Sequence, residues 1–248
     1  MRVATLNIRN GEADDSDLSW AHREHRLTLL LAELDADILG LQEVLSFQLP
    51  PIWRALREHD YVGVGRIDGD KEGEFTPIFY RRSMYDCLDF GCFWLSETPE
   101  QPGSKSWETA CERMCTWALL ESDGTRITVA NTHLDHVSVM AREKGTALIL
   151  SRLAEFEGPK ILMGDFNALP IESTIQNVLQ VGWQDSLGLD PSGTFHDFGK
   201  VEGGRIDYVF GSGLTFVQSR IFSTLTEFGY ASDHHGVEAT IQFTSGRR

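Results

Sequence analysis

The chain has 248 residues, of which 41% are hydrophobic and 10% aromatic, and its formal net charge is −15 at pH 7. Sandwiches and α/β enzymes of about this length commonly fold as one domain, so we expect residues 1–248 to form a single domain. The acidic balance, with only five lysines, argues against extended DNA or RNA as a partner, because clustered basic side chains hold a phosphate backbone.

Membrane-spanning and secretory segments in a sequence indicate where a protein is located. No apolar run approaches the roughly 18 residues that a membrane span needs, and the segment 2–7 is typical of a strand rather than of a secretory signal. We therefore expect a cytoplasmic protein without membrane contact. The spacings of Cys87, Cys92, Cys111 and Cys115 match neither CxxC redox motifs nor common zinc ribbons, which predicts reduced thiols, with a zinc knot as the alternative.

Short apolar and β-branched runs recur along the chain and predict about ten strands. They are Val3–Ile8, Ile38–Leu41, Tyr61–Val64, Phe75–Tyr80, Tyr85–Trp94, Cys115–Leu120, Thr125–Asn131, Lys160–Met163, Ile206–Phe210 and Val237–Phe243. Helical spacing of apolar residues, with one buried face, occurs in fewer places. Two such stripes are Leu27, Leu30, Leu31 and Leu34, and Ala141, Gly145, Leu148 and Ile149. Strands outnumber helices too strongly for strict βαβ alternation, which favours two packed sheets flanked by helices.

Two connecting segments, Arg66–Glu74 and Leu95–Cys111, are longer than hairpins need, and long loops in compact domains are often functional. We expect the second loop, together with Trp94 and Trp107, to shape the rim of a cleft and select the substrate. The alternative is that both tryptophans belong to the core.

Polar residues gather at the ends of predicted strands, where a sheet presents side chains to a common cleft. The segments are Asn7, Gln42-Glu43, Asn131-Thr132-His133, Gly164-Asp165-Phe166-Asn167, Arg205-Ile206-Asp207-Tyr208 and Ser232-Asp233-His234. Each segment alone is also typical of a turn or a cap. Their order and spacing as a set are far more specific.

This ordered set resembles the motifs of the endonuclease/exonuclease/phosphatase superfamily, which includes deoxyribonuclease I, apurinic endonucleases, deadenylases and inositol-polyphosphate phosphatases. The resemblance spans residues 2–242, and residues 91–99 and 102–105 are similar to a branch of bacterial and fungal members whose substrates are not established. One departure is Gly236, where many members have proline. The resemblance implies an α/β fold: a four-layer α/β/β/α sandwich of two mostly antiparallel sheets flanked by helices, as in deoxyribonuclease I.

The resemblance also implies a divalent cation, Mg²⁺ or Mn²⁺. It makes Glu43 the principal ligand, with Asn7 as a further oxygen ligand and Asp233 near the same cation. The chemistry agrees, because hydrolysis of an anionic phosphate ester requires neutralisation of charge on the phosphate oxygens, and Mg²⁺ prefers carboxylate and amide oxygens.

For catalysis, the resemblance places Asp207 and His234 within hydrogen-bond distance. The carboxylate would fix the imidazole tautomer and raise its pKa. Either this pair or Asp165 activates the attacking water, and the sequence leaves both open. Asn167 would donate a hydrogen bond to a phosphate oxygen, and His133 would contact the phosphate or assist the leaving group.

The sequence thus predicts a metal-dependent hydrolase of a phosphate monoester or diester, acting as a monomer on a phosphorylated small molecule rather than on extended nucleic acid. A nuclease acting on abasic or single-stranded DNA or RNA is the first alternative. A binding module that has kept the fold and lost catalysis is the second. It is disfavoured because none of Glu43, Asp165, Asn167, Asp207 and His234 is replaced.

Overall fold

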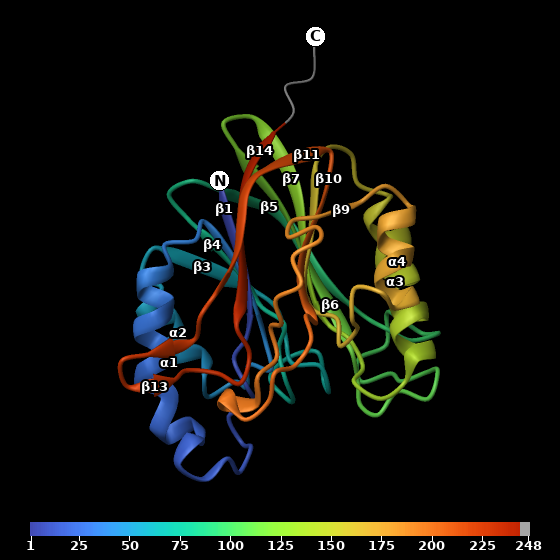
Figure 1. The fold of residues 1–248 in the computed structure, drawn as a ribbon. Coiled ribbons are helices and arrows are strands. Elements are labelled where there is room, and N and C mark those ends of the chain that lie inside the picture. The colour runs from blue at the N-terminus through green and yellow to red at the C-terminus, as the bar shows by residue number, and fades with distance from the viewer. Residues whose placement is uncertain (244–248) are drawn as a thin grey trace.

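The computed structural model describes residues 1–243 and shows two six-stranded sheets packed face to face, with helices on both outer faces (Figure 1). Helices α1 (Trp20–Leu34) and α2 (Leu49–Ala55) cover one sheet. Helices α3 (Val139–Leu153) and α4 (Ser173–Gln180) cover the other. The predicted four-layer α/β/β/α sandwich is confirmed.

The strands follow a different order in space than in sequence. The first sheet has the order β11-β14-β1-β2-β4-β3 and the second the order β5-β6-β7-β8-β10-β9. The first contains β1 (Arg2–Asn7), β2 (Ile38–Gln42), β3 (His59–Val62), β4 (Ile78–Arg81), β11 (Leu214–Phe222) and β14 (Gly236–Phe243). The second contains β5 (Asp86–Trp94), β6 (Met114–Ser122), β7 (Thr125–His133), β8 (Lys160–Asp165), β9 (Gln184–Asp185) and β10 (Asp207–Ser212). Short elements complete the fold: η1 (Ser16–Leu18), η2 (Asp197–Gly199), β12 (Leu225–Thr226) and β13 (Gly229–Tyr230).

Strand register brings the motif residues to one end of the sandwich. The parallel pair β1–β2 aligns Asn7 with Gln42. The parallel pair β7–β8 aligns His133 with Asp165, and the antiparallel pair β8–β10 sets Asp165 opposite Asp207. All remaining strand pairs in the two large sheets are antiparallel in the part of the chain that the structure describes, as expected.

A buried polar contact joins the two sheets within their otherwise apolar interface. The Gln42 Nε2 donates to Asn131 Oδ1 at 2.7 Å and to Thr5 Oγ1 at 2.9 Å, and the Asn131 Nδ2 donates to the carbonyl oxygens of Leu41 and Pro77 at 2.8 and 2.9 Å. Buried amides stabilise a unique packing when they are hydrogen-bonded. These two motif residues therefore set the alignment of the sheets.

The two helical stripes are confirmed, since Leu27, Leu31 and Leu34 are buried in α1, and Ala141, Gly145 and Ile149 are buried in α3. The sequence did not predict α2, α4 or β11. Strand β11 carries mostly exposed or half-buried side chains and a register shift between Phe216 and Gln218, which removes the apolar alternation of a typical strand.

The predicted strand Phe75–Tyr80 is shorter than expected, because β4 begins only at Ile78. Pro77 cannot donate a ladder hydrogen bond. The first and last residues of the other predicted strands agree with the structure within a few residues.

The four cysteines are free thiols, and Cys115 is buried. Among residues 1–243, no helix has the length and apolarity that crossing a membrane requires.

Gly164 lies in β8 opposite Thr132 of β7. Its φ is +141°, and a Cβ built on it would lie 1.9 Å from the Thr132 carbonyl oxygen. We predict that Gly164→Ala lowers the free energy of unfolding by about 3 kcal/mol or more, because the strands must separate. Urea denaturation measures it. Gly182→Ala is the matched control, since Gly182 also has a positive φ of +91° but faces open space, and its cost should be about 1 kcal/mol. Equal costs would contradict the steric argument.

Candidate active site

Three buried side chains form the centre of the site. Ligand atoms of Asp165, Asp207 and His234 all lie within 4.8 Å of one another. The His234 Nδ1 is 2.9 Å from Asp207 Oδ2, and its Nε2 is 3.9 Å from Asp165 Oδ2. Because Asp207 holds Nδ1, the opposite ring nitrogen faces Asp165. The second Asp207 oxygen, Oδ1, is buried without a hydrogen-bond partner among the described residues.

Asn7 connects this centre to Glu43. Its Nδ2 donates to Glu43 Oε1 at 2.9 Å and to Asp165 Oδ2 at 3.0 Å. The Glu43 Oε2 accepts a hydrogen bond from the Asn10 backbone N–H at 2.6 Å. The Asn7 Oδ1 accepts from the Arg9 N–H at 2.9 Å, so the amide nitrogen faces the carboxylates. Ligation of a cation by Asn7 and Glu43 stays a prediction.

The turn after β8 fixes the orientation of Asp165. The Asn167 N–H donates to Asp165 Oδ1 at 2.9 Å, and the Asn167 Nδ2 donates to the Leu134 carbonyl oxygen at 3.0 Å. Asn167 and Glu43 both have left-handed backbones, with φ of +47° and +61°. Such conformations are uncommon outside glycine and concentrate at functional sites.

His133 lies beside the centre, with Nε2 at 3.5 Å from Asp165 Oδ2. Burial lowers the pKa of His133 well below its ordinary value, and the charges of Arg113 and Arg66 lower it further. His133 is therefore neutral at physiological pH.

Sequence reasoning missed Glu74. Its Oε1 accepts from Asn10 Nδ2 at 2.8 Å, and its Oε2 lies 2.5 Å from Arg66 Nη1 and 3.9 Å from His133 Nδ1. Glu74 thus links the loop Arg66–Glu74 to the site. The only signal for it was the length of that loop.

Asp233 belongs to the same end of the sandwich but contacts other partners. Its Oδ1 is 3.3 Å from Ser232 Oγ, and its Oδ2 is 3.6 Å from Arg9 Nη1. Ser232 Oγ donates to the Asn7 carbonyl oxygen at 2.6 Å, which ties the start of β14 to the end of β1.

Arg23 supports these two segments from inside helix α1. The side chain is fully buried. Its Nη1 donates to the carbonyl oxygens of Ile8 and Ala231 at 2.7 and 3.0 Å, and its Nη2 donates to that of Arg9 at 3.0 Å. A buried guanidinium thereby joins the segment after Asn7 to the segment before Asp233.

Buried charge shifts two pKa values in the centre. Burial and the neighbouring Asp207 charge raise the pKa of Asp165 to about 7. Burial would lower the pKa of His234, but Asp207, Asp165 and Asp233 outweigh it and raise that pKa to about 10. His234 is therefore an imidazolium at neutral pH, and Asp165 is near its midpoint.

These residues fit a divalent cation. Buried carboxylates that lack sufficient counter-charge, including an unpartnered Asp207 oxygen, provide hard anionic ligands. A cation would also relieve the repulsion that raises the pKa of Asp165.

A second group of possible ligands, Cys111, Asp135 and His136, does not fit a cation. Both Asp135 oxygens already accept two hydrogen bonds each, from Thr109, Ala110, Val137 and Ser138. The Arg113 guanidinium also lies 3.1 Å from the His136 Nδ1 and would repel a metal ion.

The two tryptophans expected at the rim differ. Trp94 is buried, and its Nε1 donates to the Arg66 carbonyl oxygen at 2.5 Å, so it belongs to the core. Trp107 is half-buried, with φ of +58°, and its carbonyl oxygen accepts from Ser138 Oγ at 2.8 Å. Selection of the substrate by Trp107 stays a prediction.

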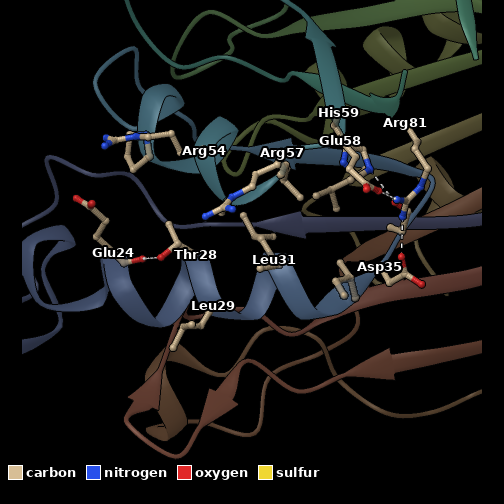
Figure 2. A pocket seen from close by; sticks show the side chains of 17 residues that line it. Glu24, Thr28, Leu29, Leu31, Asp35, Arg54, Arg57, Glu58, His59 and Arg81 are labelled. Atoms are coloured by element: carbon tan, nitrogen blue, oxygen red, sulfur yellow. Dashed lines mark hydrogen bonds and ion pairs between the residues drawn. The ribbon is translucent and has the colours of Figure 1, made fainter. Parts of the chain in front are cut away.

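A cavity of about 630 Å³ lies elsewhere, between α1 and α2. Figure 2 shows Arg57 reaching over it and Arg81 closing one end through ion pairs with Asp35 and Glu58. None of the residues expected at the active site lines it. The site is therefore defined by its polar cluster rather than by this cavity.

We predict that Asp165→Asn stabilises the metal-free protein at pH 8 by about 4 kcal/mol. The folded-state pKa of about 7 exceeds the ordinary 3.8, so stability falls as pH rises from about 4 to 7 in the wild type, and the amide removes this loss. Thermal unfolding at pH 4 and pH 8 measures it. The difference should vanish at pH 4 and shrink at pH 8 when Mg²⁺ is added. An equal difference at both pH values would contradict the argument.

Comparison with solved structures gives close matches over nearly the whole chain. An endonuclease/exonuclease/phosphatase from Bacteroides vulgatus is 32% identical, with a TM-score of 0.93 and 98% of each chain covered. A mannosyl-6-phosphatase from Bacteroides thetaiotaomicron is 31% identical, with a TM-score of 0.89, and the match covers 98% of this chain and 100% of that one.

Among sequences, the 3'-5'-exoribonuclease subunit Ccr4 of the CCR4-Not complex of Saccharomyces cerevisiae is 23% identical over 219 residues. That match covers 73% of this chain but only 25% of the relative, so this chain spans about a quarter of its length. The model of the Endonuclease/Exonuclease/phosphatase family matches residues 4–234. Its members are generally hydrolases of phosphoester bonds, and this chain belongs to that family.

Proposed function

We propose that this chain is a divalent-metal-dependent hydrolase of a phosphate ester on a small or compact substrate, with a phosphorylated sugar as the first class to test. The observation that carries the proposal is the buried cluster of Asp165, Asp207 and His234, joined to Glu43 through Asn7. Support for a small substrate comes from the net charge of −15 and from the similarity to a mannosyl-6-phosphatase.

The bound cation would supply neutralisation of the phosphate oxygens and of the leaving oxygen. Glu43 would be its principal ligand, with Asn7 and Asp233 near the same cation, which leaves Asp165 free to accept a proton. The protein residues then supply proton transfer and orientation.

The pKa values favour Asp165 as the group that activates water. Asp165, with its pKa raised to about 7, is poised to accept a proton near neutral pH, whereas His234, with its pKa raised to about 10, already carries one. We therefore assign His234 as a donor to the developing charge on phosphate, and Asp207 as the group that holds its Nδ1. The neutral His133 lies 3.5 Å from Asp165 Oδ2 and would contact the phosphate. Asn167 would also contact the phosphate.

A nuclease acting on single-stranded or abasic nucleic acid is the second candidate, and the sequence similarity to Ccr4 favours it. A panel of substrates separates the two. It contains mannose 6-phosphate, other sugar phosphates, bis(p-nitrophenyl) phosphate and single-stranded oligonucleotides, each with Mg²⁺ or Mn²⁺. Asp165→Asn serves as the control for contaminating activity. Turnover of oligonucleotides alone would replace the first proposal with the second.

We predict that Asp207→Asn lowers kcat by two to four orders of magnitude, roughly the range of a general acid–base or triad contribution. His234→Ala should match or exceed this loss, and the double variant should be little worse than His234→Ala, because residues that act as a unit are not additive. Kinetics and thermal unfolding are measured on the same preparation. Losses that multiply would exclude a functional pair.

We also predict that Glu43→Gln weakens Mg²⁺ binding by at least about tenfold, since an anionic ligand is lost from a sparse set. Calorimetric titration measures the affinity, and circular dichroism confirms folding. Glu12→Gln, at an exposed position, is the control. An unchanged affinity would place the cation elsewhere.

A further inference from the structure

The guanidinium of Arg9 is held between two carboxylates at the edge of the candidate active site. Its Nε and Nη2 donate to Asp15 Oδ2 and Oδ1 at 2.9 and 2.8 Å. The remaining nitrogen, Nη1, lies 3.6 Å from Asp233 Oδ2. The two-point pair with Asp15 fixes the plane of the guanidinium and therefore directs Nη1 at Asp233.

The backbone of Arg9 is fixed as firmly as its side chain. The residue has a left-handed φ of +65°, its N–H donates to Asn7 Oδ1, and its carbonyl oxygen accepts from Arg23 Nη2. Non-glycine residues persist in this conformation only when surrounding contacts hold them there. Arg9 therefore holds its positive charge in a fixed position, although a third of its side chain is exposed.

This charge is permanent. The hydrogen bonds to Asp15, followed by the charges of Asp233 and Glu43, raise the pKa of Arg9 above its ordinary value.

The Asp233 side of the centre already has a positive charge beside its carboxylate. Buried or half-buried charges need nearby compensation, and the Arg9 Nη1, 3.6 Å from Asp233 Oδ2, supplies it. A second cation at Asp233 would face this guanidinium at close range.

We propose that Arg9 is a resident cation on the Asp233 side of the centre and limits the centre to one divalent ion. A second ion on Asp233 would have to displace Nη1, and the guanidinium would stay beside it because Asp15 still holds the other two nitrogens. This inference rests on the proposed metal dependence.

The test is the number of Mn²⁺ ions bound by the metal-free protein, counted from the electron paramagnetic resonance of free Mn²⁺ and checked by calorimetry. The wild type should bind one ion. Arg9→Gln and Arg9→Met should bind two, the second with a dissociation constant on the order of 1 mM or lower. Arg9→Lys keeps the charge and should bind one.

Arg82→Gln is the matched control, since it removes one positive charge from an exposed ion pair with Asp60 at 3.2 Å. It should bind one ion. A structural role of Arg9 would lower thermal stability in all three Arg9 variants without changing the number of ions, so the count separates the two roles.

Two ions in the wild type, or one ion in both uncharged variants, would overturn the inference. Two ions together with Mg²⁺-dependent hydrolysis would leave the proposed function standing. The expected counts without hydrolysis of any phosphate ester would leave the inference standing and remove the function. No bound ion in the wild type would overturn both.

Discussion

The carboxylates of Asp165 and Asp207 lie side by side where water cannot solvate both. Like charges in a medium of low polarity repel strongly unless hydrogen bonds and counter-charges compensate them. The His234 imidazolium, the Asn7 amide and the Asn167 backbone N–H supply part of this compensation. The raised pKa of Asp165, about 7, reflects the part that remains. This residual repulsion favours binding of a divalent cation. In the metal-free protein it also lets Asp165 take up a proton near neutral pH.

Much of the surrounding structure holds this unfavourable arrangement in place. Gln42 and Asn131 join the two sheets, and Ser232 joins the start of β14 to the end of β1. Arg23 joins the segment after Asn7 to the segment before Asp233. Each contact uses buried polar groups whose loss would be costly. Stability is thus concentrated around a centre that is itself destabilising, a common arrangement in active sites.

The fold, and the gathering of the motif residues at one end of it, could be predicted because these residues lie at strand ends, where local pattern and ordered spacing agree. Glu74, Arg9 and Arg23 could not. Each acquires its role from a partner distant in space, and none has a local signature. Arg23 is one polar residue in an amphipathic helix, where an exposed position is the ordinary expectation. The buried Trp94 donates its Nε1–H to the carbonyl oxygen of Arg66, a contact that the sequence of either segment does not reveal.

The pairing of β1 with β14 has a consequence for synthesis of the protein on the ribosome. The site combines Asn7, at the end of the first strand, with His234, just before the last, and Thr5 pairs with Val237. Chains emerge N-terminus first, and contacts between distant segments form late. A nascent chain without residues 232–243 therefore carries Asp165 and Asp207 without the imidazolium that balances them. The candidate site is complete only once that last segment has joined the sheet.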